Sequence, residues 1–337
     1  MSPSQTLTDF FKSKLALACC LSVLGTFSLN TSAIAAAPET GTFKMGIEPW
    51  LGYGQWHVAQ SQGIFKQQGL EKVDIINFAE DKDINAALAS GQIDGANIAT
   101  HTAMAMVSAG LPVKIVLLLD QSETADALLV GKDITTLKDL KGKQVAFEEG
   151  TTSDILLHSA VNAAGLKWSD ITPVPMPADS AGSALIAKRV TAAVTYEPYI
   201  SAAKKQDPSL KMLYSGSSDP GLIGDVLVVR DSVLKEKPGQ IAALIKSWDA
   251  ALTHYQANTT ADRAIIAKAV GATPADLETA FDGVKYYSLA ENKQVLSHTF
   301  ADQTFTHVLK AATAAGLIPK PVTAAEVIDA SFVNSLP

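Results

Sequence analysis

Five short segments hold most of the side chains that could contact or transform a ligand, and none of them contains Lys or Arg. They span residues 48–56, 100–102, 120–124, 148–154 and 196–199, and they combine aromatic rings, hydroxyls and carboxylates. Carboxylates and aromatic faces attract positive charge, so these segments favour a cationic or amide-like, nitrogen-rich ligand. An anion would have only helix N-termini and hydroxyls to hold it. The candidate ligand contacts are Glu48, Trp50, Tyr53, Trp56, Thr100, His101, Asp120, Thr152, Asp154, Tyr196 and Glu197.

Each candidate also has a purely structural explanation. Glu48 and Glu197 each precede a proline, which favours an extended backbone and would make them turn residues. Asp154 lies near the start of a predicted helix, where a carboxylate interacts favourably with the helix dipole. His101 could cap a helix, and the tryptophans of residues 48–56 could equally belong to the core. The alternatives stay open at the level of the sequence.

The spacing of the other reactive side chains does not predict an enzyme. The six His residues show no HExxH spacing, and no GxSxG, P-loop or GxGxxG motif occurs. Glu148 and Glu149 would point to opposite faces of an extended segment, so they form a poor acid–base pair. The two cysteines are the adjacent Cys19 and Cys20. We therefore expect no catalytic residue, no metal site and no cofactor.

The composition argues against a protein that binds nucleic acid. The 337 residues are 47% hydrophobic and 18% charged, and the 27 basic residues include only 3 Arg against 34 acidic residues, for a net charge of −7. A nucleic-acid binder needs a basic face, which this balance does not provide. The length fits one large or two ordinary domains.

The first 35 residues have the layout of a secretory signal peptide. A weakly basic start with Lys12 and Lys14 precedes an apolar run over residues 15–29, and small residues follow up to Ala35. The apolar run is short for a membrane-spanning helix. We expect cleavage before Ala36 and an exported, soluble, periplasmic protein. A lipid anchor on Cys20 is the alternative, but residues 17–20 match a lipobox poorly.

The remaining sequence predicts an α/β protein. Short apolar runs alternate with helix-period segments from Phe43 to about Thr195, which is typical of parallel strands joined by crossover helices. After residue 231 the strand pattern ends, and apolar residues at helical spacing predict helices over residues 241–255 and 293–315. Strands are predicted at residues 43–48, 72–78, 94–99, 113–119, 126–131, 144–148, 172–176, 192–196 and 225–230. Helices are predicted at residues 55–67, 82–90, 101–109, 152–164, 179–187 and 198–206.

A weak internal repeat indicates two similar lobes. Residues 87–96 recur as residues 184–193, and the strand, loop and helix of residues 43–63 recur as residues 144–165. Ligands of open α/β sheets bind beyond the carboxyl ends of the strands, so the two lobes should face each other across a ligand cleft. The predicted boundaries are residues 36–125 and about 225–337 for lobe 1 with the C-terminal helices, and about 126–224 for lobe 2.

Several segments together resemble the periplasmic substrate-binding proteins of ABC importers in the nitrate, sulfonate, taurine and thiamine-precursor group. The resemblance covers nearly all of residues 43–320. It implies a type II periplasmic binding protein fold, a monomer, and partnership with a permease and an ATPase in the inner membrane. The segments that carry it are residues 46–54, 63–65, 86–96, 139–143 and 193–198.

Residues 48–50, 99–102 and 147–154 look most like the branch of this group that is associated with urea-carboxylase-type enzymes. That branch implies a urea-like or guanidine-like ligand and a role in nitrogen uptake, in agreement with the acidic segments. Residues 188–191 (KRVT) depart from the family, which usually has Gly and then Asp before the strand. This turn would lie away from the cleft, so we expect little effect on binding.

The resemblance implies that two lobes close around a solute and present a closed form to the permease. The alternative ligands are taurine, alkanesulfonates and nitrate. Two other functions stay open: an enzyme of the thiamine-pyrimidine synthase type, and a sensory protein that presents its ligand to a receptor.

Overall fold

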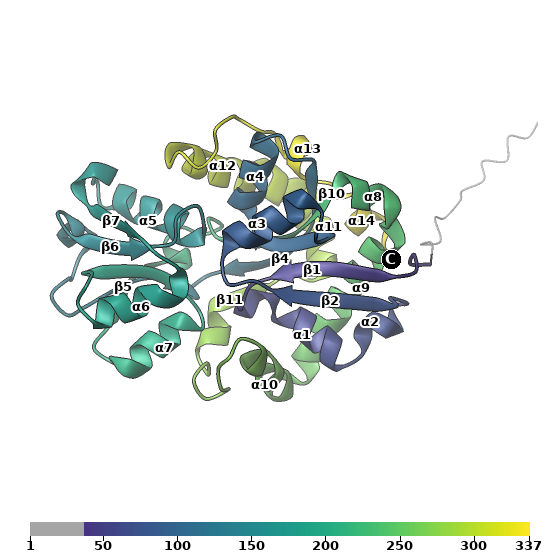
Figure 1. The fold of residues 1–337 in the computed structure, drawn as a ribbon, viewed down its shortest axis with the longest axis horizontal. Helices are drawn as coiled ribbons and strands as arrows, with labels where there is room; N and C mark the ends of the chain where they lie inside the picture. Colours follow the sequence, from purple (N-terminus) through teal and green to yellow (C-terminus); the bar gives the residue numbers. More distant parts are fainter. Residues whose placement is uncertain (1–36) are drawn as a thin grey trace, which may run out of the picture. The chain divides into compact units, whose positions relative to one another are not determined.

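The computed structural model describes residues 37–337. The predicted signal peptide, its cleavage site before Ala36 and the two cysteines lie outside the described residues. Two sheets with helices on their faces form the described part, as Figure 1 shows with β1, β2 and β4 in one sheet and β5, β6 and β7 in the other. Within residues 37–337, no helix is both long and apolar enough to cross a membrane.

The first sheet has six strands and the second has five. The spatial order is β11-β4-β10-β3-β1-β2 in the first and β7-β6-β8-β5-β9 in the second. The bounds are β1 Thr42–Ile47, β2 Lys72–Asn77, β3 Gly95–Ala99, β4 Val113–Ser122, β5 Asp126–Val130, β6 Gln144–Phe147, β7 Thr172–Pro175, β8 Ala192–Tyr196, β9 Lys211–Ser215, β10 Gly224–Arg230 and β11 Val284–Tyr286.

The helices lie between the strands and after the last long strand. Their bounds are α1 Gly54–Ser61, α2 Ile64–Gln67, α3 Asp81–Ser90, α4 Thr100–Ser108, α5 Thr152–Ala163, α6 Ala178–Ile186, α7 Tyr199–Gln206, α8 Asp231–Glu236, α9 Pro238–Ala257, α10 Thr259–Ala269, α11 Leu289–Gln294, α12 Phe305–Ala314, α13 Ala324–Val327 and α14 Ser331–Ser335.

The expectation of parallel strands up to Thr195 is partly wrong. β1 pairs in parallel with β2 and β3, and β6 pairs in parallel with β7 and β8. β5, however, is antiparallel to both β8 and β9, and β10 is antiparallel to both β3 and β4. Both are strands at which the chain enters one sheet from the other: β5 follows β4, and β10 follows β9. Neither strand is therefore joined to its predecessor by the crossover helix that makes two strands of one sheet parallel.

The prediction that strands end after residue 231 is wrong, because β11 extends the edge of the first sheet and pairs with β4. β9 was also not predicted. Both are short edge strands with little apolar pattern. The predicted helix over residues 55–67 is two helices, separated at Gly63, whose φ of 68° suits the absence of a side chain. The predicted helix over residues 293–315 begins earlier, at Leu289, and has a π-helical turn region over Val295–Thr304 before α12.

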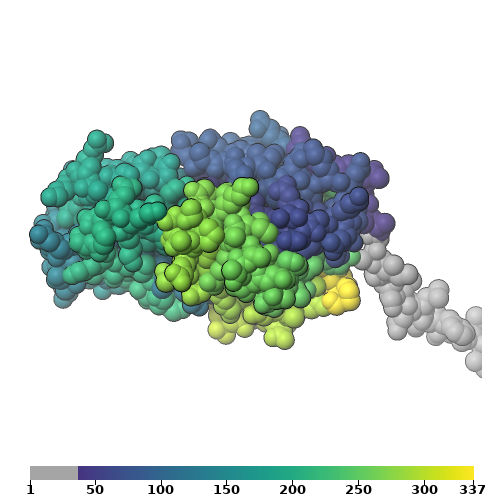
Figure 2. All heavy atoms as spheres, turned by 90° about the horizontal axis from the view of Figure 1, so that it is seen from below, coloured from purple at the N-terminus to yellow at the C-terminus, as the bar shows by residue number. Residues whose placement is uncertain are grey.

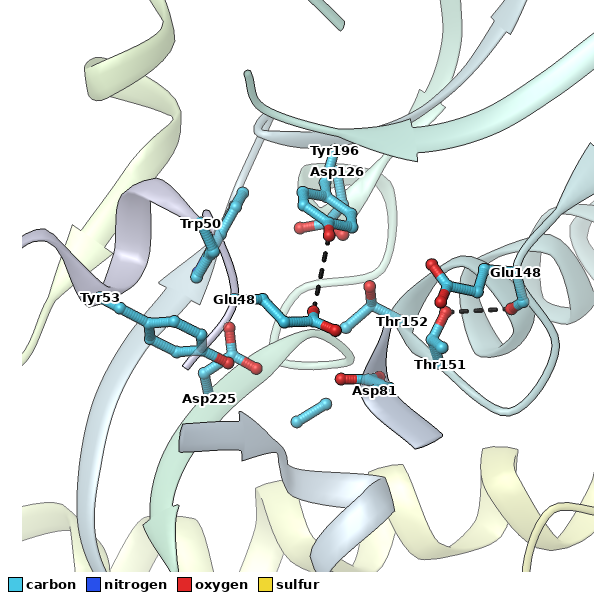
Figure 3. Close-up of a pocket in the computed structure, with 11 residues that line it drawn as sticks. Glu48, Trp50, Tyr53, Asp81, Asp126, Glu148, Thr151, Thr152, Tyr196 and Asp225 are labelled. Atoms are coloured by element: carbon cyan, nitrogen blue, oxygen red, sulfur yellow. Dashed lines mark hydrogen bonds between the residues drawn. The ribbon is translucent and has the colours of Figure 1, made fainter. Parts of the chain in front are cut away.

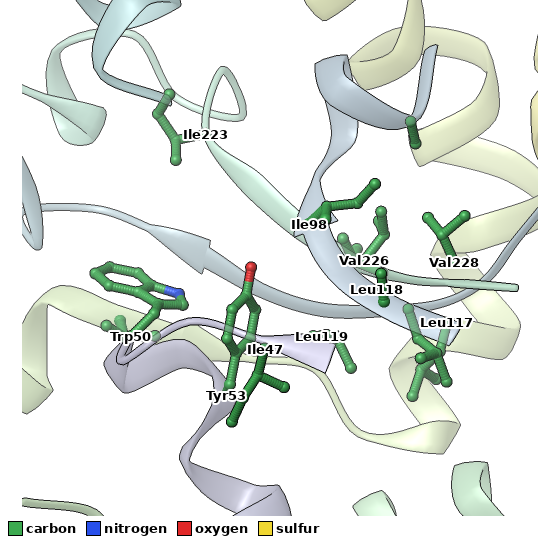
Figure 4. Packing of buried hydrophobic residues seen from close by; sticks show 14 of the residues in the cluster. Ile47, Trp50, Tyr53, Ile98, Leu117, Leu118, Leu119, Ile223, Val226 and Val228 are labelled. Carbon is green, nitrogen blue, oxygen red and sulfur yellow. The ribbon is translucent and has the colours of Figure 1, made fainter. Parts of the chain in front are cut away.

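Strand alternation explains how the second sheet is buried on both faces. Leu128 and Val130 of β5 join the large apolar cluster that also contains the core of the first sheet, whereas Ala127 and Leu129 pack into a smaller cluster with α6 and α7. Successive side chains of a strand point to opposite faces, so one strand serves both clusters. Figure 4 shows part of the large cluster, in which Trp50 and Tyr53 lie with apolar residues of β1, β3, β4 and β10.

The chain passes between the two sheets twice within the described residues, over residues 123–125 from β4 to β5 and over residues 216–223 from β9 to β10. The two connections touch, since Ser217 N–H donates to the carbonyl of Glu123. Figure 2 shows the face on which the green C-terminal helical segment lies between the teal half and the dark blue half. On this side, Lys205 of α7 pairs with Asp276 at 2.6 Å.

Candidate ligand-binding site

A pocket lies between the facing edges of the two sheets (Figure 3). Its lining contains five carboxyl groups and several aromatic and hydroxyl groups, but no Lys, Arg or His. The lining residues are Glu48, Trp50, Tyr53, Asp81, Ala99, Asp126, Glu148, Thr151, Thr152, Tyr196 and Asp225.

The topology explains why these residues meet. Glu48 follows β1 and Glu148 follows β6, so both lie at carboxyl ends of parallel strands. Asp126 and Asp225 lie at the amino ends of β5 and β10, the strands that run antiparallel to their neighbours. An antiparallel strand starts at the edge where its parallel neighbours end, so all four carboxyls reach the same cleft. Asp81, the first residue of α3, completes the set.

Two aromatic side chains from different sheets meet in the pocket. Tyr196, at the end of β8, donates a hydrogen bond of 3.5 Å from its phenol to Oε2 of Glu48. The rings of Tyr196 and Trp50 lie edge to face, with centroids 5.8 Å apart. Such aromatic pairs contribute about 0.5–1.5 kcal/mol beyond the area that they bury. The pair therefore links the two sides of the cleft at the site.

Burial and mutual repulsion raise the pKa values of the pocket carboxyls. Burial raises the pKa of Glu48 well above its usual range, and the nearby carboxyls of Asp81, Glu148 and Asp225 raise it further. For the same first cause, the pKa of Glu148 is raised to about 7 and that of Asp81 to about 6. Each raised pKa means that the charged form lacks water or a cation to stabilise it.

Asp126 shows the same effect on the other side of the cleft. Burial raises its pKa to about 6, although hydrogen bonds with Ser122 and Thr152 favour the charged form. Burial also raises the pKa of Asp225 well above its usual range, and Asp120 contributes next. No fixed positive charge in the pocket lining offsets these carboxyls. A cation between them would supply what the lining lacks.

Asp120 and Gly52, which lie outside the pocket lining, fix the position of Trp50. Trp50 Nε1 donates a hydrogen bond of 3.3 Å to Oδ1 of Asp120, which is fully buried on β4. Asp120 faces Asp225 across the antiparallel pair of β4 and β10. Gly52 allows this arrangement, because a Cβ atom at this position would overlap both Trp50 Nε1 and Oδ2 of Asp120. Asp120 therefore positions a lining residue without lining the pocket itself.

The cavity is small, with a volume of about 20 Å³. A space of this size holds little more than a water molecule. A solute of several heavy atoms would therefore enter only if the two sides of the cleft separated or the lining side chains moved apart. The contact between Tyr196 and Glu48 would have to open in that movement.

Five of the residues predicted from the sequence come together in this pocket: Glu48, Trp50, Tyr53, Thr152 and Tyr196. Their part in ligand binding stays a prediction. Trp56 lies elsewhere, in the core, where its Nε1 donates to Oδ1 of Asn97 at 2.9 Å and its ring packs on Trp248. The structural explanation for Trp56 is therefore the one that fits.

Three other predicted contacts do not line the pocket. Thr100, the first residue of α4, donates to the carbonyl of Gly224 in β10 at 2.7 Å. Asp120 supports Trp50 from behind, as described above. Asp154 accepts from the N–H of Gly150 at 2.8 Å and so closes its own loop at the start of α5.

His101 and Glu197 also lie outside the pocket lining. His101 is buried, and burial lowers its pKa to about 4. Glu197 accepts two hydrogen bonds of 3.0 Å from the N–H and hydroxyl of Ser201 in the first turn of α7. Its carboxylate therefore serves the start of that helix, which agrees with the structural explanation of this residue.

Sequence reasoning missed three carboxyls of the pocket, Asp81, Asp126 and Asp225. The predicted contacts follow strands at their carboxyl ends, whereas Asp126 and Asp225 lie at the amino ends of antiparallel strands and Asp81 begins a helix. Glu148 and Thr151 lie in a segment that was expected to line the cleft but were not chosen as contacts. Asp126 carried a signal: it is an acidic residue directly before an apolar run.

The site does not resemble a metal centre. Among residues 37–337, no group of three or more His, Cys, Asp or Glu side chains is arranged to hold a metal ion.

Comparisons with known proteins agree with this architecture. A family model described as NMT1/THI5 like matches residues 53–259. A Brucella abortus (strain 2308) protein with the provisional name of a binding protein is 26% identical over 224 residues, which are 66% of this chain and 69% of that protein. The taurine-binding periplasmic protein of Escherichia coli (strain K12) is 27% identical over 205 residues, which are 60% of this chain and 63% of that protein.

A solved structure shows the same fold. The alkanesulfonate-binding protein SsuA from Xanthomonas axonopodis pv. citri, bound to MOPS, superposes with a TM-score of 0.71. The match covers 86% of this chain and 99% of that protein at 21% sequence identity. The two sheets with their helices therefore have the periplasmic binding protein fold, as the sequence predicted.

Proposed function

Because the chain belongs to the NMT1/THI5-like family, we propose that it is the solute-binding component of an ABC importer and captures a small, positively charged, nitrogen-rich solute of the guanidinium type. The chain would bind and release this solute without changing its covalent bonds. It would act in the periplasm as a monomer and deliver the solute to a permease and ATPase complex in the inner membrane. The taurine-binding relative is named as a periplasmic protein, which supports this location.

The five carboxyls of the pocket carry the argument about ligand charge. Glu48, Asp81 and Asp225 come from the first sheet and its helices, and Asp126 and Glu148 come from the second. A guanidinium ion has N–H donors along all of its edges, so carboxyls on both sides could accept from it at once. The face of a planar cation could also lie against the ring of Trp50 or Tyr196.

The two-sided lining suggests how capture would work. A solute bound to Glu48 on one side would attract Asp126 and Glu148 on the other, and the population would shift toward the closed form. We propose that the two sheets move as units about residues 123–125 and 216–223, where the chain passes between them. The permease would then recognise the closed form.

A taurine-like or sulfonate ligand is the second candidate. The name of the Escherichia coli relative favours it, and so does one feature of the pocket: α5 begins at Thr152, so its N-terminus faces the site. Helix N-termini bind anions. The five carboxyls oppose it, because a sulfonate placed among them would be repelled.

Thermal unfolding at pH 8 separates these ligand classes. The protein would be heated with millimolar guanidinium, acetamidinium, urea, taurine or nitrate, far below denaturing concentrations of guanidinium. A ligand that binds only the folded state raises the melting temperature. We expect the largest increase with guanidinium or acetamidinium. An increase with taurine or nitrate alone would refute the proposed ligand class.

A further inference from the structure

We propose that the pocket exchanges protons for its ligand: without a cation the carboxyl groups hold protons between them, and a bound cation displaces at least one proton. This inference rests on the proposed function and adds a coupling to it. Capture of a cation would then be strong in neutral surroundings and weak in acidic ones.

The arrangement of the carboxyls is the first support. Five carboxyl groups line one small pocket, and those of Glu48 and Asp81 are close enough that the charge of Asp81 raises the pKa of Glu48. Like charges held together disfavour ionisation, so the two groups hold a proton more readily together than either would alone. The phenol of Tyr196 donates its one proton to Glu48, so it does not donate to the other carboxyls of the pocket.

Among residues 37–337, no Lys, Arg or His lines the pocket and could take the place of these protons. Lys82 interacts with Glu148, but it is exposed and paired with Glu80 at 2.6 Å. Lys204 lies near Glu197, outside the lining. The other titratable groups that face the pocket carboxyls are acidic or phenolic. They are Tyr53, Glu80, Asp120, Asp179, Tyr196, Glu197 and Tyr199.

Burial sets the pH range of the exchange. It raises the pKa of Glu148 to about 7, and the pKa values of Asp81 and Asp126 to about 6. These groups therefore hold protons in part near neutral pH, and a cation that favours their charged form removes those protons. Affinity for the cation should rise with pH through this range and level off above it.

The coupling also separates two ligands that the sequence could not distinguish. Guanidinium carries a charge, so its binding must favour ionised carboxyls and release protons. Urea is neutral and could accept a hydrogen bond from a protonated carboxyl as well as donate to a charged one. Binding of urea should therefore release few protons and depend little on pH.

A pH-stat measurement on the protein of residues 37–337 tests the exchange of protons for the cation directly. Unbuffered protein at pH 6.5 would be mixed with guanidinium chloride adjusted to the same pH, and the base needed to restore the pH would be recorded. We expect release of roughly one proton per bound guanidinium, and affinity roughly tenfold weaker at pH 5.5 than at pH 7.5. Binding of guanidinium without proton release, or with equal affinity at both pH values, would overturn the inference and leave the proposed ligand class intact.

A pair of neighbouring variants sharpens the test. Glu148→Gln removes a pocket carboxyl and should reduce the number of protons released. Glu149→Gln changes the next residue, which is exposed and does not line the pocket, and should leave the release unchanged. Equal release from both variants and the original protein would contradict the role given to Glu148. If guanidinium binds at no pH while taurine binds, the proposed ligand class fails together with this inference.

Discussion

The phenol of Tyr196 donates a hydrogen bond of 3.5 Å to the carboxylate of Glu48, and the two side chains come from different sheets. The bond lies inside the acidic pocket, next to the edge-to-face contact of Tyr196 with Trp50. One tyrosine therefore contacts both a carboxyl group and an aromatic ring on the opposite side of the cleft. We therefore expect this contact to take part in both ligand binding and the closure of the cleft.

Removal of the phenol should weaken ligand binding and leave the fold intact. In Tyr196→Phe the ring still packs against Trp50, but Glu48 loses its donor from the other sheet. We expect guanidinium to bind about three- to tenfold more weakly, a loss typical of one hydrogen bond between uncharged groups. Calorimetry measures the affinity, and circular dichroism checks the fold. An unchanged affinity would show that this bond plays no part in the closed form.

Glu48 and Glu197 provide a matched comparison, because each precedes a proline and only Glu48 lines the pocket. Glu48→Gln should weaken binding of guanidinium by roughly ten- to a hundredfold, since the cation loses a buried partner. Glu197→Gln should change the affinity by less than about twofold and lower the free energy of unfolding by about 1 kcal/mol, since Ser201 loses a charged acceptor. Equal losses of affinity in both variants would contradict this assignment.

The close approach at Gly52 predicts a third result. In Gly52→Ala the new Cβ overlaps Trp50 Nε1 and the carboxyl of Asp120, so the Trp50 ring must move. We expect at least a tenfold loss of affinity and a loss of about 1–3 kcal/mol in the free energy of unfolding. Gly131→Ala is the control, because nothing lies within 4 Å of a Cβ at that position. Binding as strong in Gly52→Ala as in the control would mean that the position of Trp50 is unimportant.

Much of the fold could be predicted from the sequence because burial leaves a clear pattern. The strand of residues 113–119 and the helix of residues 82–90 follow from apolar runs and helical spacing, and both are present as β4 and α3. The direction of a strand leaves no such pattern. An apolar run such as residues 126–131 has the same sequence pattern whether the neighbouring strands are parallel or antiparallel to it.

The site could be predicted only in part for the same reason. Glu48 follows β1 and Tyr196 ends β8, and each of these strands has a parallel neighbour, so a rule about carboxyl ends finds them. Asp225 lies near the start of a strand, and its place in the pocket depends on β10 running antiparallel between β3 and β4. Glu197 is adjacent to Tyr196 in the sequence, but its side chain accepts a hydrogen bond from Ser201 in α7. Local sequence does not determine which of two adjacent side chains enters a cleft.

The buried carboxyl of Asp126 should make the unliganded protein less stable at high pH. Its folded-state pKa is raised to about 6, so its favourable contribution is present below the unfolded pKa near 4 and is lost as the pH rises through 6. Asp126→Asn should therefore raise the free energy of unfolding at pH 8 by roughly 1–3 kcal/mol and change it little at pH 4. Urea denaturation at the two pH values measures this.

Asp133→Asn is the control for this measurement, because Asp133 is exposed. It should alter the free energy of unfolding by less than about 0.5 kcal/mol at either pH. If Asp126→Asn lowers the free energy of unfolding at pH 8, the folded protein stabilises the charged form of Asp126. Burial would then not raise the pKa of this carboxyl group. The gain in stability should be accompanied by weaker binding of guanidinium, as is common when a strained site is relieved.

Isothermal titration calorimetry with guanidinium and taurine at pH 8 determines whether the pocket prefers a cation or a sulfonate. Among residues 37–337, the pocket lining has five carboxyls and no basic side chain, so we expect a saturable heat signal for guanidinium at one site per chain and an affinity for taurine at least about a hundredfold lower. Tight binding of taurine with no measurable binding of guanidinium would refute a cation-binding pocket.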